Sequence, residues 1–257
     1  MERFLGQVGL VTGASEGIGY AIAQRLIHEG AHIVICGRRP DVLKAAADRL
    51  GDRCTPAVLD VEDSMGLAAL IKKTHAQHGR FDLLVNNAMH VGWSPIAVTE
   101  LQAFQQDFRV NVDAAFVSTR AAMSLMQEQG QGAIVNVASI NGLLAIDNMA
   151  AYSASKAALI HFSKCAAMEA AVANVRINVI APGVISTGAT VDALGGIPGY
   201  TEAVAAGVPM NRLGHPDEVA SAACFLLSDE ASYVTGVCLS IDGGKAAQLV
   251  VPPAPES

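Results

Sequence analysis

The sequence has few charged and few aromatic residues. Of its 257 residues, 16% are charged and 5% are aromatic, whereas 51% are hydrophobic and 24 are glycine. Disordered chains show the opposite balance, with low hydrophobicity and high charge, so this composition excludes disorder and suits a globular fold with a large aliphatic core. The length fits one large α/β domain or two small ones.

Basic clusters and long apolar runs are also missing. The formal net charge is -7, and no run of Lys or Arg is longer than Arg38-Arg39. Such a chain repels a phosphate backbone, so we expect no nucleic-acid partner. No apolar run approaches the roughly 18 residues of a membrane span, and residues 1–7 lack the apolar stretch of a signal peptide. We expect a cytoplasmic protein with no membrane partner.

The cysteines form neither a disulfide framework nor a metal site. They are odd in number and far apart, with no C-x-x-C spacing, so we predict reduced thiols in the core and no bound metal. They are Cys36, Cys54, Cys165, Cys224 and Cys238.

Short apolar runs alternate with helical segments from end to end. The runs occupy residues 8–12, 32–37, 54–60, 83–86, 133–137, 176–181 and 237–241. Parallel strands joined by right-handed helical crossovers must be covered on both faces. The pattern predicts an α/β fold, a doubly wound parallel sheet (Rossmann fold) in three α/β/α layers. Since no linker or repeat interrupts it, we expect a single domain over residues 1–257.

Two stretches break this alternation. Residues 183–211 are rich in Gly, Thr and Ala, and we predict a mobile loop with a short helix there, shaping a substrate pocket. Residues 246–257 contain three prolines and read as a C-terminal arm without regular structure.

A glycine-spaced turn follows the first strand. The pattern T-G-x-x-x-G-x-G over residues 12–19 places glycines at 13, 17 and 19. Glycine lets the backbone approach a pyrophosphate, and the helix that follows offers free N–H groups at its positive end. Ordinary strand-to-helix turns show similar glycines, but the position in a first βα unit favours a dinucleotide.

Tyr152 and Lys156 are spaced for one face of a helix. An ammonium beside a phenol favours the phenolate, so we predict a Tyr152 pKa below its usual value near 10 and a role as acid and base. Most such pairs only lie side by side on a solvated face. Ser139, at the end of a predicted strand, favours a site at the carboxyl edge of the sheet.

Together these motifs resemble the short-chain dehydrogenase/reductase family, from Thr12 to Gly244. That family resemblance implies an NAD(P)-dependent oxidoreductase that interconverts a ketone and a secondary alcohol. The matching elements, in chain order, are the glycine pattern, Asp60, Asn86-Asn87-Ala88, Asn111, Ser139, Tyr152 with Lys156, and Pro182-Gly183.

The resemblance implies a catalytic role for four residues. Tyr152 exchanges a proton with the carbonyl or alcohol oxygen, and Ser139 hydrogen-bonds the same oxygen. Lys156 holds the cofactor ribose hydroxyls and lowers the tyrosine pKa. Asn111 positions a water that connects the lysine to solvent; alternatively, it is a buried amide that satisfies helix backbone.

The resemblance also implies cofactor contacts. Asp60 meets the adenine edge, Asn87 lies on the ribose side, and Ile185 with Thr187 binds the carboxamide. A strand-end turn, an Asx turn and a helix cap are the alternative roles. The expected set is Gly13, Ser15, Gly17, Ile18, Gly19, Arg38, Arg39, Asp60, Val61, Asn87, Ala88, Tyr152, Lys156, Pro182, Gly183, Ile185 and Thr187.

The choice of nicotinamide depends on the end of the second predicted strand. Arg38 and Arg39 offer planar donors that suit the 2′-phosphate of NADP, where an acidic residue would select NAD. Glu16 argues for NAD, because NADP-preferring relatives often carry a basic residue there. We predict NADP, with NAD as the alternative.

The substrate prediction rests on departures from the family pattern. Met89 replaces the usual glycine after Ala88, and His90 and Trp93 follow it, either in the substrate pocket or on an exposed loop. Residues 127–131 and 170–174 contain no Lys or Arg that would attract an acidic carrier protein. We predict a small, mainly apolar ketone or alcohol, surrounded by Val91, Ile140, Leu143, Leu144, Ile146 and Met149.

Two alternatives remain at this point. One is a reductase of 3-oxoacyl thioesters on acyl carrier protein, and the other is a non-catalytic dinucleotide-binding protein. The helices expected around residues 107–129 and 151–172 are apolar on more than one face, and the resemblance implies a homotetramer, with a dimer next.

Overall fold

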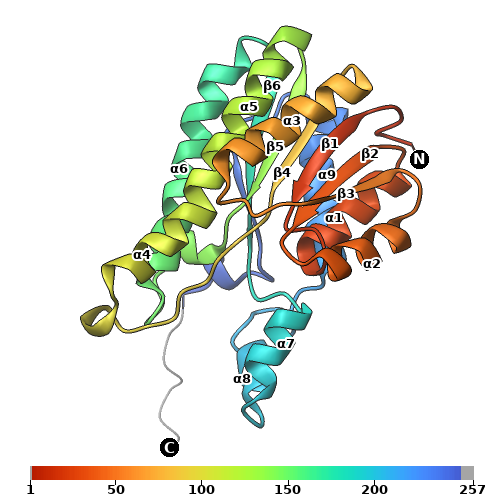
Figure 1. Ribbon diagram of the computed structural model, residues 1–257. Helices are drawn as coiled ribbons and strands as arrows, with labels where there is room; N and C mark the ends of the chain where they lie inside the picture. Colours follow the sequence, from red (N-terminus) through yellow and green to blue (C-terminus); the bar gives the residue numbers. More distant parts are fainter. Residues whose placement is uncertain (1, 250–257) are drawn as a thin grey trace, which may run out of the picture.

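A seven-stranded parallel sheet forms the centre of the computed structural model, which describes residues 2–249 (Figure 1). The strand order is β3-β2-β1-β4-β5-β6-β7, and every neighbouring pair is parallel. This confirms the predicted doubly wound fold. The strands are β1 (Val8–Thr12), β2 (His32–Gly37), β3 (Cys54–Val58), β4 (Leu83–Asn86), β5 (Gly132–Val137), β6 (Val175–Pro182) and β7 (Cys238–Ile241).

Helices cover both faces of the sheet (Figure 1). One layer consists of α1 (Gly17–His28), α2 (Pro40–Leu50) and α9 (Pro216–Leu227), and the other of α3 (Ser64–His78), α5 (Ala114–Gln129) and α6 (Ala150–Ala171). Successive strand residues serve opposite cores, so Leu10 packs with the second layer and Val11 with the first. The strand order reverses between β1 and β4, which opens a crevice at their carboxyl ends.

The segment 183–211 is more regular than predicted. It contains two helices, α7 (Gly188–Gly195) and α8 (Tyr200–Ala206), which extend away from the carboxyl edge of the sheet (Figure 1). The prediction of a loop with one short helix was therefore wrong. Neither helix has a buried residue, so neither needs an apolar face. The apolar periodicity that marks a helix packed on a core is therefore missing from this part of the sequence.

Other local predictions also need correction. The third strand ends at Val58, before the predicted residue 60. The arm predicted from residue 246 begins inside a 3-10 turn, Lys245–Ala247, and residues 250–257 lie outside the described part. All five cysteines are free, but only Cys36 and Cys224 are buried, and Cys165 on α6 is exposed. No helix within residues 2–249 is long and apolar enough to cross a membrane.

Candidate active site

The glycine turn between β1 and α1 takes a backbone conformation that other residues rarely adopt. Gly13 and Gly17 have φ angles of +63° and +60°. A Cβ added to Gly13 would lie 2.8 Å from the Cα of Ala88, and one on Gly17 would lie 3.3 Å from the Thr187 methyl group. The turn thus lies close to the ends of β4 and β6, which bound the same crevice.

The end of β4 holds this turn in place. The Asn87 side chain donates to the carbonyl oxygens of Thr12, at 2.9 Å, and Gly13, at 3.0 Å. The Thr12 hydroxyl in turn accepts hydrogen bonds from the backbone N–H groups of Asn87 and Ala88, both at 3.0 Å. A Cβ on Gly19 would lie 2.4 Å from the Asn87 amide nitrogen, so the third glycine allows this packing.

The two arginines after β2 each face an acidic residue. Arg39 Nη2 lies 2.6 Å from a Glu16 carboxylate oxygen, and Arg38 Nη1 lies 3.9 Å from Asp60 Oδ2. All four side chains are exposed, at 70% for Arg38 and 57% for Arg39. Of the two arginines, Arg38 therefore makes the longer ion pair and is more exposed to solvent.

The remaining predicted cofactor residues lie around the same edge. Val61 is buried in the core beside the site, and Ile18 packs against the core on the other face. Gly183 follows β6, where a Cβ would lie 2.9 Å from the Cα of Asp242. Thr187 caps α7, because its hydroxyl oxygen accepts from the Thr190 N–H at 3.2 Å. Its cofactor contact stays a prediction. The others are Ser15 in the glycine turn, Pro182 at the end of β6, and Ile185, which is buried.

Tyr152 and Lys156 lie together in the first turns of α6. Their residues are 6% and 1% exposed. Lys156 Nζ lies 5.7 Å from the Tyr152 ring centroid and donates to the Val137 carbonyl oxygen at 2.9 Å, at the carboxyl end of β5. Ser139 follows the same strand, close enough to the Tyr152 phenol for its hydroxyl to affect the pKa of that group. The structure thus brings together the three residues whose spacing predicted a site at this edge.

The electrostatics of this pair differ from the prediction. Burial raises the pKa of Tyr152, the hydrogen bond from Ser139 opposes that rise, and the Asp107 carboxylate adds to it. Burial also lowers the pKa of Lys156 to about 7, with Asp107 opposing. The predicted lowering of the tyrosine pKa by Lys156 was wrong for the protein alone, because the desolvation of both groups outweighs their interaction.

Asn111 lies in a π-helical turn, Arg109–Asp113, between α4 (Leu101–Phe108) and α5. Its amide donates to the His90 carbonyl oxygen and to Ser155 Oγ, and its Oδ1 accepts from the His90 N–H, each at 2.9 Å. Asn111 therefore anchors the loop after β4. π-Helical turns of this kind frequently lie at functional sites. The water link to Lys156 stays a prediction.

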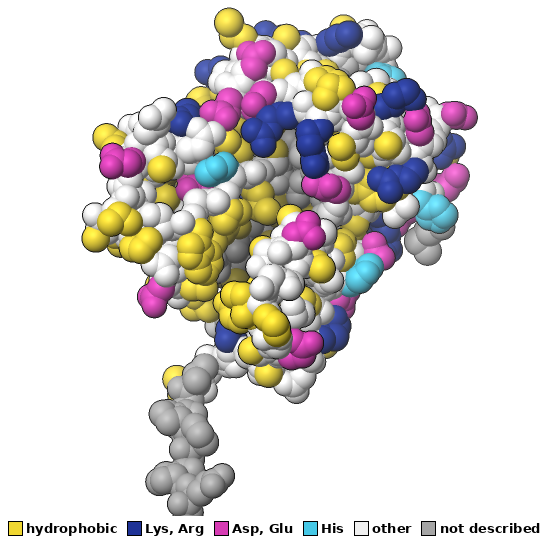
Figure 2. Space-filling model, turned by 60° about the horizontal axis from the view of Figure 1, so that its bottom comes forward, with side chains coloured by type: hydrophobic (Ala, Val, Ile, Leu, Met, Phe, Trp, Pro, Cys, Tyr) yellow, Lys and Arg dark blue, Asp and Glu magenta, His cyan; other side chains and the backbone are white. Residues whose placement is uncertain are grey.

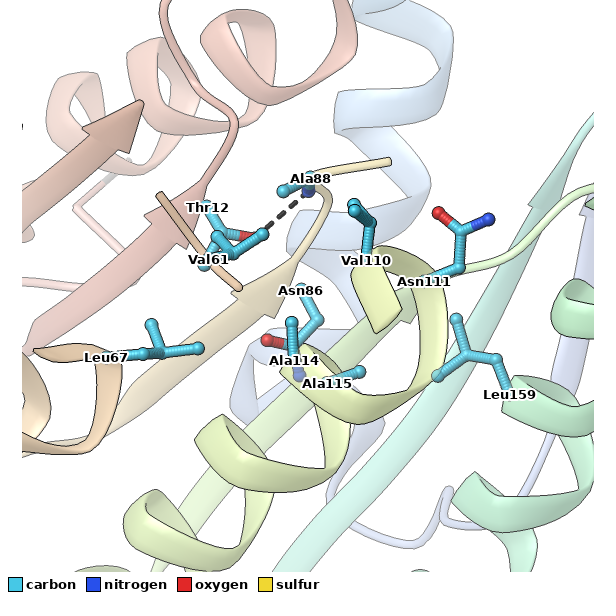
Figure 3. A pocket seen from close by; sticks show the side chains of 10 residues that line it. All are labelled: Thr12, Val61, Leu67, Asn86, Ala88, Val110, Asn111, Ala114, Ala115 and Leu159. Carbon is cyan, nitrogen blue, oxygen red and sulfur yellow. Dashed lines mark hydrogen bonds between the residues drawn. The ribbon is translucent and has the colours of Figure 1, made fainter. Parts of the chain in front are cut away.

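Two cavities adjoin these residues. The smaller, about 10 Å³, lies between β1, β4, α3, α5 and α6 and has room for about one water molecule. Figure 3 shows the Asn111 and Val110 side chains on one side of it and Thr12, bonded to Ala88, on the other. The larger, about 530 Å³, lies between the loop after β4, α4 and the start of α6. Hydrophobic side chains gather in a hollow on this face of the molecule (Figure 2).

The predicted substrate residues divide into two groups. Ile140 and Met149 are buried, whereas Val91, Leu143, Leu144 and Ile146 are 42–48% exposed. Sequence reasoning missed Asp107, which lines the larger cavity with no exposed surface. No signal in the sequence separates this aspartate from those of a solvated helix face.

Known proteins of similar sequence are dehydrogenases and reductases, as the arrangement of Ser139, Tyr152 and Lys156 suggests. A family model described as enoyl-(acyl carrier protein) reductase matches residues 13–246. The chain belongs to the short-chain dehydrogenase/reductase family. Its relatives include the 3-oxoacyl-[acyl-carrier-protein] reductase FabG of Escherichia coli, 36% identical over 242 residues, which are 94% of this chain and 98% of the relative. The cis-4-hydroxycyclohexanecarboxylate dehydrogenase of Sinomonas cyclohexanicum is 36% identical over 251 residues, 96% and 99% of the two chains.

A solved structure, levodione reductase, superposes with a TM-score of 0.90 at 30% identity, covering 96% of this chain and 100% of that one. As a short-chain dehydrogenase/reductase, the chain is an NAD(P)-dependent oxidoreductase that interconverts a ketone and an alcohol. Its crevice fits a nicotinamide dinucleotide, because the glycines at 13 and 17 leave the backbone bare of side chains at the start of α1.

Proposed function

We propose that this dehydrogenase/reductase acts on a small, mainly apolar ketone or secondary alcohol, with Tyr152 as its acid and base. The observation that carries the proposal is the position of Tyr152, buried beside Lys156 and close to Ser139 at the carboxyl edge of the sheet. Tyrosine in such a position can exchange a proton with a substrate oxygen in the crevice.

Reduction requires a proton at the carbonyl oxygen. The bound nicotinamide supplies the hydride chemistry. Tyr152 and Ser139 hydrogen-bond the carbonyl oxygen, and Tyr152 gives it the phenolic proton. Since burial raises the pKa of Tyr152, this proton is present at neutral pH. In oxidation the Tyr152 phenolate accepts the proton of the alcohol and becomes the phenol again.

NADP is the proposed cofactor. Arg38 is exposed and 3.9 Å from its nearest carboxylate, so its guanidinium is available to a 2′-phosphate, whereas Arg39 is committed to Glu16 at 2.6 Å. The glycine turn would hold the pyrophosphate, Lys156 the ribose hydroxyls, Asp60 and Val61 the adenine side, and Ile185 with Thr187 the carboxamide. NAD is the alternative cofactor if the repulsion of a 2′-phosphate by the Glu16 carboxylate outweighs its attraction to Arg38.

A 3-oxoacyl thioester on acyl carrier protein is the second candidate substrate, supported by the similarity to FabG. The charge of the protein argues against it, because the net charge is -7 and residues 127–131 and 170–174 lack basic side chains. The similarity to dehydrogenases of a hydroxycyclohexanecarboxylate and of a 3alpha-hydroxysteroid supports a free cyclic substrate. The family membership and the assembled Ser139, Tyr152 and Lys156 argue against a non-catalytic role.

A homotetramer is the proposed assembly. Apolar side chains remain exposed on α5 and α6, with Phe116 44% and Met168 62% exposed, and Val172, directly after α6, is 92% exposed. Exposed apolar residues on surface helices are typical of subunit interfaces. A cytoplasmic location stays a prediction.

The test replaces the phenolic hydroxyl. With NADPH and a panel of cyclic ketones, Tyr152→Phe should lower kcat by about 10²- to 10⁴-fold, because it removes the proton donor. Binding of NADPH, measured by fluorescence titration, should stay unchanged. Tyr233→Phe is the matched control, since Tyr233 is fully exposed. Unchanged turnover in Tyr152→Phe would overturn the proposed role.

A further inference from the structure

Asp107 is a buried carboxylate that the proposed reaction does not use. It is the buried residue of α4 and has 0% exposure. Its Oδ1 accepts from the Gly92 N–H at 3.1 Å and lies 3.3 Å from His90 Nδ1. Its Oδ2 has no hydrogen-bond partner among the described residues. A carboxylate buried with so few donors destabilises the fold, so its presence needs another explanation.

The partner imidazole is held in a defined position. Asn111 hydrogen-bonds both the N–H and the carbonyl oxygen of His90, which fixes its backbone. To donate to the Asp107 carboxylate, the ring must carry its proton on Nδ1. Nε2 of the neutral ring is then a hydrogen-bond acceptor. The His90 side chain is 40% exposed, so the ring is not fully covered by its neighbours.

His90 and Asp107 line the cavity of about 530 Å³ between the loop after β4, α4 and the start of α6. Much of the wall is apolar and includes Trp93, Ile96 and Phe104, and Ala151 in the same wall immediately precedes Tyr152. Among the described residues, none of those that line it is Lys or Arg. The cavity therefore combines a largely apolar wall with one hydrogen-bonded His90–Asp107 pair, and the neutral ring of that pair presents an acceptor.

We propose that His90, oriented by Asp107, determines specificity by accepting a hydrogen bond from a hydroxyl group of the substrate, remote from the carbon that is oxidised or reduced. This inference rests on the proposed function and adds the substrate class. A hydroxyl is favoured over a carboxylate because an anion in this cavity would meet the buried Asp107 charge without a Lys or Arg to offset it. Asp107 is a positioning residue that acts through the ring.

The test compares matched ketones. A cyclic ketone with a hydroxyl opposite the carbonyl should show a kcat/KM about tenfold above that of its methyl analogue, the worth of one buried hydrogen bond. His90→Phe should reduce this ratio to about one. His161→Phe is the control, since His161 is exposed on α6 outside the cavity. An unchanged ratio in His90→Phe would overturn the proposal. So would a higher kcat/KM for a third analogue that carries a carboxylate in place of the hydroxyl.

Variants at Asp107 separate orientation from general damage. Asp107→Asn keeps an oxygen that accepts from both Gly92 and the ring, so it should retain the preference for the hydroxyl ketone. Asp107→Leu removes that oxygen and should abolish the preference while the methyl ketone is still reduced. Equal loss of both ketones in both variants would show a structural role only and contradict the inference.

The tautomer of His90 gives a readout that does not depend on turnover. Two-bond ¹H–¹⁵N spectra of the cofactor-bound protein should show the proton on Nδ1 in the native chain and on Nε2 in Asp107→Leu. A native ring protonated on Nε2 alone would overturn the inference even if ketones are reduced. Failure of Tyr152→Phe to slow any ketone would instead overturn the proposed function, so the two results are distinguishable.

Discussion

Lys156 is a cation that the fold surrounds almost completely. It is 1% exposed, its hydrogen bond goes to the Val137 carbonyl oxygen, and burial lowers its pKa to about 7. A lysine kept in this state weakens the fold at neutral pH, because the unfolded chain would hold the proton more tightly. Such a position is expected of a residue retained for chemistry.

This gives a prediction for stability against pH. Between pH 6 and 8 the unfolded chain keeps the Lys156 proton while the folded chain loses it, so the lysine contribution to the free energy of unfolding should rise by about 1 kcal/mol. Lys156→Met should lack this rise. Urea denaturation of both cofactor-free proteins at pH 6 and pH 8 measures the difference. An equal change of the free energy of unfolding with pH in the native protein and in Lys156→Met would show that the pKa of Lys156 in the folded chain is near its usual value.

The proposed role of Arg38 gives a second prediction at this scale. Arg38→Leu should weaken NADPH binding by about tenfold, the worth of charge-assisted hydrogen bonds to one phosphate, and should leave NADH binding unchanged. Fluorescence titration measures both constants. Arg53→Leu is the control, because Arg53 is exposed before β3. If the native protein binds NADH more tightly than NADPH, Glu16 rather than Arg38 governs the choice.

At the scale of elements, the turn between β1 and α1 depends on glycine for two separate reasons. Gly13 combines a φ of +63° with a clash, since an added Cβ would lie 2.8 Å from the Ala88 backbone. Gly130, which ends α5, has a similar φ of +72° but open space around it. Alanine at Gly130 would therefore introduce backbone strain alone, whereas alanine at Gly13 would introduce the same strain together with a clash in the crevice.

Alanine at these glycines should give different results. Gly130→Ala should cost about 1 kcal/mol of stability, because a side chain disfavours positive φ, and should leave cofactor binding intact. Gly13→Ala should cost more and should also weaken NADPH binding, since the β4 end must move. Thermal unfolding and fluorescence titration test both. Equal stability and full binding in Gly13→Ala would contradict the packing described here.

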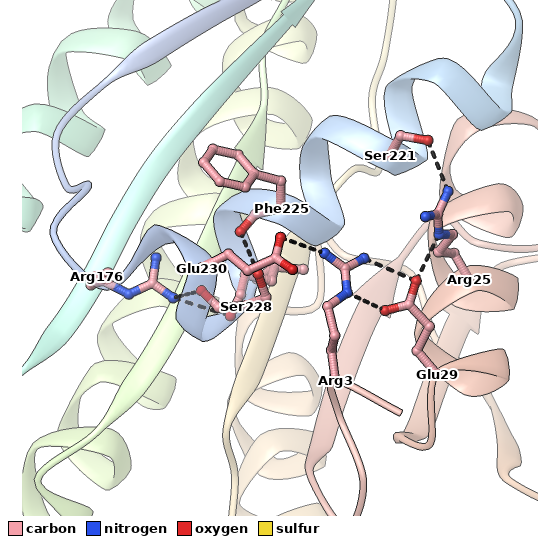
Figure 4. A network of polar contacts seen from close by, with 9 residues as sticks. Arg3, Arg25, Glu29, Arg176, Ser221, Phe225, Ser228 and Glu230 are labelled. Carbon is pink, nitrogen blue, oxygen red and sulfur yellow. Dashed lines mark hydrogen bonds and ion pairs between the residues drawn. The ribbon is translucent and has the colours of Figure 1, made fainter. Parts of the chain in front are cut away.

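At the scale of the whole molecule, a buried carboxylate ties the N-terminal segment to α1 and α9. Glu29 is 6% exposed and accepts hydrogen bonds from Arg3, at 2.5 and 2.9 Å, and from Arg25 at 2.8 Å. Arg3 also reaches Glu230 after α9, and Arg25 reaches Ser221 within it (Figure 4). The network joins segments from both ends of the chain around one side of the sheet.

Acid should weaken this connection. The hydrogen bonds from Arg3 lower the pKa of Glu29, so its contribution is present above the usual carboxyl pKa and is lost as the pH falls through the lower folded value. Glu29→Gln should cost about 1–3 kcal/mol at pH 7 and much less at pH 3. Urea denaturation at both values measures this. Asp48→Asn, in the exposed pair with Lys44, is the control and should cost under about 1 kcal/mol.

The sequence by itself determined the sheet, the glycine turn and the pairing of Tyr152 with Lys156. These follow from local periodicity and chain order, because apolar runs alternating with helices allow few topologies and parallel strands end at one edge. A spacing of one helical turn places two side chains together wherever the helix lies.

Only the tertiary structure decided the features that depend on contacts between distant segments and on the exclusion of water. It buried Lys156 and Asp107, paired Arg39 with Glu16, and brought His90 against α4. It also formed α7 and α8 where the sequence shows no apolar stripe. Burial changes a pKa through desolvation, and desolvation depends on which surfaces meet in the folded chain, which residue types and spacing do not specify.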